Sequence, residues 1–201
     1  MELTNEDNIE LMARYEDNYF DLAIVDPPYG IDNKLASGGR GFNQKYRDSN
    51  KWDIKPKKEY FNELKRVCKN YIIWGGNYFS NYLLPNRCFL VWYKLHTKPL
   101  PTMADCELAL TSFDKNAKIY ESRNGGEKIH PTQKPVKLYE WLLMNYAKEG
   151  DKILDTHLGS GSIAIACHNL GYDLTACELD KEYYNAAIKR INEHKQQIRM
   201  F

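Results

Sequence analysis

Apolar runs that alternate with helical patterns are the feature of this sequence that most limits its fold. Most of these runs are continuous, which is typical of strands covered on both faces. The runs are Asp21–Asp26, Tyr71–Gly75, Cys88–Tyr93, Asp105–Ser112, Lys152–Asp155 and Asp173–Glu178, with a weaker one at Glu2–Asn5. Helical spacing occurs over Asn8–Arg14, Glu59–Lys69, Val136–Ala147, Ser162–Leu170 and Lys181–Glu193. This alternation predicts an α/β protein with a doubly wound, mostly parallel, seven-stranded sheet.

The length and composition fit one globular domain. A chain of 201 residues, 43% hydrophobic and 27% charged, is long enough to bury a core without disulfides. The cysteines are Cys68, Cys88, Cys106, Cys167 and Cys177, and their spacing forms neither a CxxC pair nor a set of metal ligands. No signal peptide is visible, and no apolar stretch approaches the ~18 residues of a membrane helix. We therefore expect a single cytoplasmic domain over residues 1–201, without a metal site or a membrane partner.

The charge is unevenly distributed, although the net charge is only +1. Residues 1–32 are acidic and residues 34–66 are basic. Loop 31–56 has no helical or strand period, and a segment of this length is usually functional. Its candidate DNA-binding residues are Lys34, Arg40, Lys45, Tyr46, Arg47, Lys51 and Trp52. Basic residues interleaved with aromatic ones suit a phosphate backbone, although a solvated surface is the commoner explanation of a charge run taken alone.

A glycine loop follows the strand Lys152–Asp155. Asp155 ends the strand, Gly159, Ser160 and Gly161 form a tight turn, and small residues begin the next helix. Glycines let the backbone approach a ligand, and the helix N-terminus offers free N–H groups to it. Glu178 ends the following strand, where a carboxylate can accept both hydroxyl protons of a ribose. The spacing fits S-adenosylmethionine and nicotinamide cofactors alike, and a structural glycine turn is the alternative.

An Asp-Pro-Pro-Tyr turn follows the strand DLAIVD, which places Asp26 where open α/β sheets bind ligands. Pro27 and Pro28 fix φ and lack N–H groups, so the turn is stiff and its carbonyls are uncommitted acceptors. The Asp26 carboxylate and the Pro27 carbonyl can each accept one proton of an aromatic amino group, which directs the nitrogen lone pair at a methyl donor. Tyr29 can stack on the aromatic ring. The turn therefore predicts amino-group methylation, with a rigid capping turn as the structural alternative.

These two motifs together resemble those of the amino-group DNA methyltransferases, the family that methylates adenine N6 or cytosine N4. The resemblance covers nearly the whole chain and is carried also by the sequences HPTQKP at His130–Pro135 and WGGNY at Trp74–Tyr78. It is closest to the class in which the DPPY motif precedes the cofactor motif. It implies a circularly permuted, Rossmann-like, S-adenosylmethionine-dependent methyltransferase fold, in which Glu2–Asn5 is the third strand of the usual order.

The resemblance also implies roles for individual residues. The catalytic residues would be Asp26, Pro27, Pro28 and Tyr29. The cofactor-binding residues would be Asp7, Asn8, Thr132, Gln133, Lys134, Asp155, His157, Gly159, Ser160, Gly161 and Glu178. Asp7 and Asn8 would lie by the cofactor's adenine ring and HPTQKP at its methionine end. The family commonly has Asp-Pro-Phe before the glycines where this chain has Asp155-Thr156-His157, so we expect His157 to pack against the cofactor rather than to catalyse.

We expect a site-specific DNA methyltransferase that moves a methyl group from S-adenosylmethionine to adenine N6 by base flipping and direct displacement. Aspartate rather than serine in the first position of the turn favours adenine. Cytosine-N4 methylation is the nearest alternative, followed by RNA or protein-amide methylation and an inactive DNA- or cofactor-binding protein. A dehydrogenase would leave the DPPY and HPTQKP motifs without a role. Segment 113–129 is a second, short candidate for DNA recognition, and the sequence leaves a homodimer and a partner restriction enzyme open.

Overall fold

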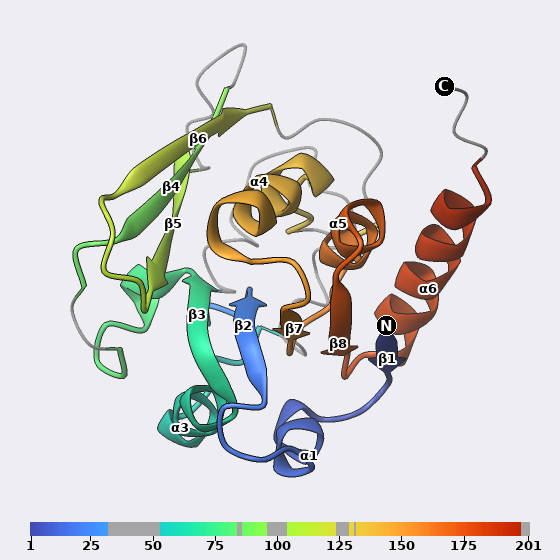
Figure 1. The fold of residues 1–201 in the computed structure, drawn as a ribbon, viewed down its shortest axis with the longest axis horizontal. Coiled ribbons are helices and arrows are strands. Elements are labelled where there is room, and N and C mark those ends of the chain that lie inside the picture. The colour runs from blue at the N-terminus through green and yellow to red at the C-terminus, as the bar shows by residue number, and fades with distance from the viewer. Residues whose placement is uncertain (32–52, 84–85, 96–103, 124–128, 131, 198–201) are drawn as a thin grey trace.

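The structure is a computed structural model that describes residues 1–31, 53–83, 86–95, 104–123, 129–130 and 132–197. Within these residues, one sheet of eight strands runs through the molecule in the order β1-β8-β7-β2-β3-β5-β4-β6 (Figure 1). The strands are β1 (Glu2–Thr4), β2 (Phe20–Val25), β3 (Cys68–Trp74), β4 (Phe89–Lys94), β5 (Cys106–Thr111), β6 (Lys118–Ser122), β7 (Lys152–Asp155) and β8 (Asp173–Cys177). Neighbouring strands are parallel except where β5 pairs with β3 and β4.

Helices cover both faces of this sheet. They are α1 (Asn8–Ala13), α3 (Lys58–Val67), α4 (Val136–Tyr146), α5 (Ser162–Leu170) and α6 (Lys181–Gln196), with a short 3-10 turn η3 (Gly76–Tyr78) after β3. One buried cluster joins α4, α5 and α6 to one face, and a second joins α1 and α3 to the other (Figure 1). Trp74 and Trp92 are fully buried in the first cluster, and Phe61 in the second. The doubly wound, mostly parallel fold predicted from the sequence is confirmed.

The expected number of seven strands is wrong because β6 is an additional strand. It pairs in parallel with β4 and lies at the edge of the sheet, so it needs only one hydrogen-bonding neighbour. Its sequence, KIYES, has no continuous apolar run, since an edge strand leaves much of its surface in water. Ile119, for example, is 57% exposed. Part of segment 113–129, expected to serve DNA recognition, is therefore a strand of the sheet.

Local signals explain where the helices begin and which face they bury. The Oδ1 atom of Asp180 accepts hydrogen bonds from the N–H groups of Glu182 and Tyr183 at 2.8 and 3.0 Å, which caps α6. On α3, the apolar side chains of Phe61 and Leu64 recur at helical spacing and are fully buried. The helices therefore cover the sheet from both sides.

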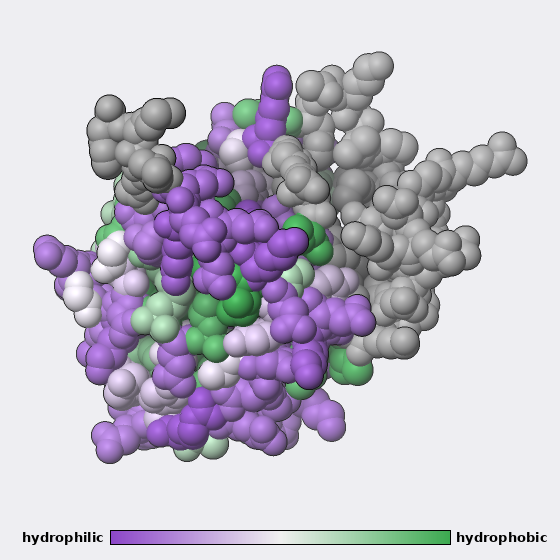
Figure 2. Space-filling model, turned by 90° about the vertical axis from the view of Figure 1, so that its right-hand side faces the viewer, coloured by the Kyte–Doolittle hydropathy of each residue, from purple (hydrophilic) through white to green (hydrophobic). Residues whose placement is uncertain are grey.

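No helix in the described ranges combines the length and the apolar character needed to cross a bilayer. Figure 2 shows one face of the molecule, on which hydrophilic residues predominate around a smaller central area of hydrophobic ones.

Candidate active site

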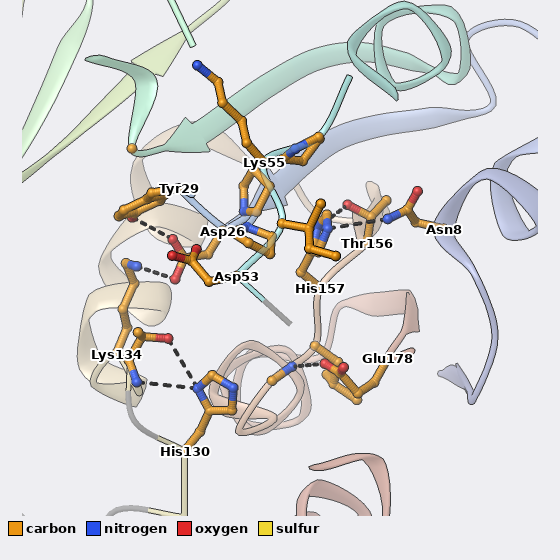
Figure 3. Close-up of a pocket in the computed structure, with 18 of the residues that line it drawn as sticks. Asn8, Asp26, Tyr29, Asp53, Lys55, His130, Lys134, Thr156, His157 and Glu178 are labelled. Carbon is orange, nitrogen blue, oxygen red and sulfur yellow. Dashed lines mark hydrogen bonds and ion pairs between the residues drawn. The ribbon is translucent and has the colours of Figure 1, made fainter. Parts of the chain in front are cut away.

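The carboxyl ends of β2, β7 and β8 meet at one cavity of about 1300 Å³. Asp26 follows β2, the glycine loop follows β7 and Glu178 follows β8, as the parallel pairing of these strands requires. Figure 3 shows Asp26 and Tyr29 on one side of the cavity, with His157 and Glu178 on the other. Motifs that lie more than a hundred residues apart in the sequence therefore share one site.

The Asp-Pro-Pro-Tyr turn holds Tyr29 in a fixed position. Its hydroxyl group donates a 2.7 Å hydrogen bond to Oδ1 of Asp26, and its ring stacks on Tyr78 of η3 at a centroid distance of 4.9 Å. Gly75, between β3 and η3, has a φ of +68°, and a Cβ atom there would lie 2.1 Å from Cε1 of Tyr29. Glycine is therefore required at position 75 both by the backbone conformation and by the tyrosine ring.

Asp53 binds the backbone directly after this turn, and the sequence did not predict it as a site residue. Its carboxylate accepts hydrogen bonds from the backbone N–H groups of Gly30 at 2.9 Å and Ile31 at 2.6 Å. The Asp53 residue is only 6% exposed. It stands two residues before Lys55, whose Nζ donates to the carbonyl oxygen of Tyr78. Asp53 is one of several acidic residues in a basic stretch and belongs to no local pattern, so its hydrogen-bond partners are visible only in the folded chain.

Four buried or half-buried charges of alternating sign lie beside the turn. The Lys134 ammonium, 1% exposed, pairs with Oδ2 of Asp26 and lies 3.0 Å from Oε2 of Glu107 in β5. Oε1 of Glu107 in turn lies 2.6 Å from Nζ of Lys94, the last residue of β4. Sequence reasoning singled out Lys134 for the cofactor's methionine end, whereas its ammonium faces these two carboxylates. Glu107 and Lys94 were not predicted, because residues on different strands meet only through the sheet register.

Burial and the neighbouring charges shift the pKa values of this cluster in opposite directions. It raises the pKa of Asp26 above its ordinary value, while the positive charge of Lys134 opposes that rise. Burial also favours the neutral amine of Lys134, but Asp26 and Glu107 outweigh it and raise the pKa of the lysine. For Glu107, the positive charges of Lys134 and Lys94 outweigh burial and lower the pKa. The two carboxyl groups therefore favour the charged form of the lysine that lies between them.

Hydrogen bonds and close packing fix the conformation of the glycine loop. The N–H of Gly159 donates to Oε2 of Glu178 at 2.8 Å, and Oε1 of Glu178 accepts from the N–H of Asp180 at 3.0 Å. Arg190 of α6 donates to the carbonyl oxygen of Ser160 at 2.7 Å. A Cβ atom at Gly161 would lie 2.8 Å from Ile191, so this glycine allows α6 to pack closely. Gly159 and Ser160 line the cavity, and Gly161 supports the loop.

His157 links the glycine loop to α1. Its Nε2 lies 3.3 Å from Nδ2 of Asn8 and its Nδ1 lies 2.9 Å from Oγ1 of Thr156. The ring also packs against Tyr60 at a centroid distance of 5.3 Å. Burial lowers the pKa of His157 to about 3, so the imidazole is neutral at physiological pH. Its backbone N–H donates to Oδ1 of Asp155 at 3.0 Å, and burial raises the pKa of Asp155 to about 8.

The other predicted site residues have identifiable positions. Asp7 caps α1, its Oδ1 accepting from the N–H of Ile9 at 2.7 Å, and Asn8 rather than Asp7 lines the cavity. Thr132 and Gln133 line the cavity as well. Oγ1 of Thr132 lies 3.1 Å from Nδ1 of His130, and Oε1 of Gln133 accepts from the N–H of Ile129 at 3.1 Å. Their assignment to cofactor binding stays a prediction, as do the predicted roles of the other site residues.

The DNA-binding candidates of loop 31–56 lie outside the described residues. They are Lys34, Arg40, Lys45, Tyr46, Arg47, Lys51 and Trp52. Their proposed contacts with DNA stay predictions.

The fold and the site define a class of Rossmann-like α/β proteins that hold a ligand at the carboxyl edge of a parallel sheet. Within this class, the family model described as DNA methylase (N6_N4_Mtase) matches residues 86–189, just over half of the chain. The chain belongs to this family. The matched region contains Lys134, the glycine loop and Glu178, while the Asp-Pro-Pro-Tyr turn precedes it.

Curated relatives match over nearly all of the chain. The Type II methyltransferase M.HpaI of Haemophilus parainfluenzae is 27% identical over 92% of this chain and 72% of its own length. The Type II methyltransferase M2.DpnII of Streptococcus pneumoniae is 27% identical over 95% of this chain and 89% of its own length. The predicted resemblance to amino-group DNA methyltransferases is confirmed.

Solved structures share the fold. The complex of M1.HpyAVI with SAM superimposes with a TM-score of 0.66 at 23% identity, covering 95% of this chain and 98% of that one. The cytosine-N4-specific PvuII DNA methyltransferase superimposes with a TM-score of 0.63 at 12% identity, covering 96% of this chain and 90% of that one. At these identities the likeness concerns the arrangement of strands and helices.

Proposed function

We propose that this protein transfers the methyl group of S-adenosylmethionine to the N6 amino group of adenine in DNA. The observation that carries the proposal is the shared cavity, in which the Asp26 carboxylate faces the same space as the glycine loop and Glu178. A donor held at the glycine loop and an amine held at the turn would therefore occupy the same cavity, as direct transfer requires.

The residues on the donor side fit S-adenosylmethionine. Gly159 lines the cavity at a φ of +52°, and a Cβ atom there would lie no closer than 3.8 Å to its nearest neighbour, the carbonyl oxygen of His157, so its backbone is not closed off by tight packing. The Glu178 carboxylate accepts two backbone hydrogen bonds and keeps further lone pairs for the hydroxyl groups of a ribose. Leu179, which is 71% exposed, and Ile9, which is 38% exposed, line the cavity as apolar surfaces for an adenine ring. When bound, the cofactor supplies an electrophilic methyl group on a sulfonium.

The residues on the acceptor side fit an aromatic amine. The lone pair of such an amine is delocalised into the ring, and acceptors on both N–H bonds localise it on nitrogen. Asp26 accepts from Tyr29 and Lys134 and still has lone pairs left for an N–H of the substrate. The Pro27 carbonyl is the second acceptor in the proposal. Tyr29 offers its ring for stacking with the flipped base, which contributes about 1–3 kcal/mol in comparable contacts.

Two amines require this arrangement, adenine N6 and cytosine N4. Aspartate at the first position of the turn supports adenine, whereas the shared fold with a cytosine-N4-specific enzyme keeps cytosine N4 as the second candidate. The Type II methyltransferases among the relatives support DNA as the substrate and a role beside a restriction enzyme. Digestion of treated DNA to nucleosides and mass spectrometry distinguishes N6-methyladenine from N4-methylcytosine.

The first test is Asp26→Ala. Loss of a group that acts on the amine should lower kcat by at least ~100-fold. The affinity for S-adenosylmethionine, measured by calorimetry, should change little. Asp17→Ala, at an exposed ion pair with Arg66 outside the cavity, is the matched control and should keep the wild-type rate. Full activity of a folded Asp26→Ala variant would reduce Asp26 to a structural residue of the turn.

A further inference from the structure

The cluster Lys94–Glu107–Lys134–Asp26 is not explained by stability. Two lysines and two carboxylates lie at least four-fifths buried, in ion pairs of 2.6 Å for Lys94 with Glu107 and 3.0 Å for Glu107 with Lys134. Removing such charges from water costs several kcal/mol per ion, and apolar side chains of similar volume often serve stability as well or better. The cluster also lines the candidate active site, with Asp26 at the end that faces the proposed amine. A role in the chemistry of the site would explain why these four charges are buried together.

We infer that Glu107 is a positioning residue that shares Lys134 with Asp26 and so keeps Asp26 able to take up the proton that the methylated amine releases. This inference rests on the proposed function. Methyl transfer forms an N–C bond with the nitrogen lone pair and breaks the S–C bond, whose electron pair stays on sulfur. The amine nitrogen is then positively charged, and one N–H proton must leave it. Asp26 is the acceptor in contact with that amine, and protonated Asp26 is neutral.

The geometry explains why a shared lysine suits this step. A lysine paired with Asp26 alone would bind the carboxylate strongly and make it a weak base. The negative charge of Glu107, 3.0 Å from the same ammonium, offsets part of the effect of Lys134 on Asp26. Lys94, on the other oxygen of Glu107 at 2.6 Å, keeps Glu107 ionised and in place. Ala109 lies on the same face of β5 as Glu107 and pairs with Trp74 of β3. The Nζ atom of Lys134 lies 5.4 Å from the centroid of the Trp74 ring.

Other groups also face Asp26 and belong to its titration. Tyr29 donates to it from the turn. Tyr139 of α4 and Asp155 at the end of β7 interact with it electrostatically, and His130 does the same with Lys134. None of them is changed in the two variants that test the inference.

The test is the pair Glu107→Gln and Lys94→Met. Loss of the Glu107 charge leaves Lys134 to Asp26 alone, so the titration of Asp26 should move to lower pH by about 1 unit. Without the Lys94 charge, Glu107 should interact more strongly with Lys134. The titration of Asp26 should therefore move to higher pH. The readout is the carboxyl ¹³C resonance of Asp26 in the protein without DNA, assigned by its disappearance in Asp26→Asn. The acidic limb of the kcat profile should move in the same two directions, with kcat of Glu107→Gln reduced about tenfold.

The control is Glu140→Gln, which removes another buried glutamate, one that pairs with Lys137 and Asn169 away from this cavity. It should leave the Asp26 resonance unchanged. Midpoints that stay at the wild-type value in both test variants overturn the inference, even if the enzyme methylates DNA. Midpoints that move in opposite directions in a protein that methylates no DNA support the sharing of Lys134 and refute the proposed function. If Glu107→Gln does not fold, Lys94→Met alone still decides the direction.

Discussion

Gly75 is the residue on which the position of Tyr29 depends most directly. Gly75→Ala must place a Cβ atom at a φ of +68° and 2.1 Å from the Tyr29 ring, so the ring has to leave its stack on Tyr78. We expect methyl transfer to fall at least about tenfold. The matched control is Gly150→Ala, which has a φ of +84° and no atom within 4 Å of the new Cβ. It should cost only the backbone strain of roughly 1–2 kcal/mol in a urea melt and keep its activity. Equal activity of the two variants would contradict this view of Tyr29.

His157 makes the stability of the protein depend on pH. Because burial depresses its pKa to about 3 in the folded state, His157 contributes stability above the unfolded pKa near 6.5. That stability is lost as the pH falls from there toward 3. Between pH 6.5 and pH 5 the loss should be about 1.6 kcal/mol.

The corresponding variant is His157→Phe, which keeps a ring against Tyr60 and cannot titrate. Urea melts should show a smaller decline of the free energy of unfolding between pH 7 and pH 5 than in the wild type. His168→Phe, at an exposed position on α5, serves as the control and should retain the wild-type decline. An identical decline in His157→Phe would mean that the imidazole does not stay neutral in the folded chain.

At the scale of elements, the segment Asp53–Lys55 supports the Asp-Pro-Pro-Tyr turn from two sides. Asp53 accepts hydrogen bonds from the N–H groups of Gly30 and Ile31, which follow the turn. Lys55 donates a hydrogen bond to the carbonyl oxygen of Tyr78, the residue on which Tyr29 stacks. Asp53→Ala should cost ~2–4 kcal/mol of folding stability, since two hydrogen bonds to a carboxylate are lost. It should also lower kcat more than tenfold without weakening cofactor binding. Asp151→Ala, which removes a carboxylate bonded to the N–H of Lys148 in a distant turn, is the control and should leave kcat unchanged.

The sequence predicts elements well where a local pattern repeats and poorly where partners meet across the fold. The strands β2, β7 and β8 are continuous apolar runs, so their existence and the motifs at their ends are predictable. The edge strand β6 has no such run because one side of it meets water. Asp53 and Glu107 are equally hidden, since each is a single acidic residue whose partner lies on another element. Secondary structure and motifs are therefore local properties, whereas the charge cluster is a property of the sheet register.

At the scale of the whole molecule, DNA binding is expected to depend on the basic stretch after the Asp-Pro-Pro-Tyr turn. Flipping a base out of a duplex costs a few kcal/mol, which phosphate contacts must offset. Replacing Arg40, Lys45 and Arg47 together by alanine should reduce the slope of log affinity against log salt by up to about 2.7, at roughly 0.9 per phosphate contact. Fluorescence anisotropy with a labelled duplex measures this slope, and calorimetry should show unchanged S-adenosylmethionine affinity. An unchanged slope would make these residues ordinary solvated surface.

The pairing of β1 with β8 has a consequence for how the protein is made. Glu2 lies opposite Thr175, and Asn8 meets His157, which stands 149 residues further along the chain. A ribosome releases the first partner of each pair long before it adds the second, so these contacts cannot form during most of synthesis. A nascent chain that has passed η3 already carries the Asp-Pro-Pro-Tyr turn and Tyr78, but it has neither the glycine loop nor Glu178. The cavity therefore stays incomplete until the start of α6, whose Lys181 and Tyr183 line it, has been synthesised.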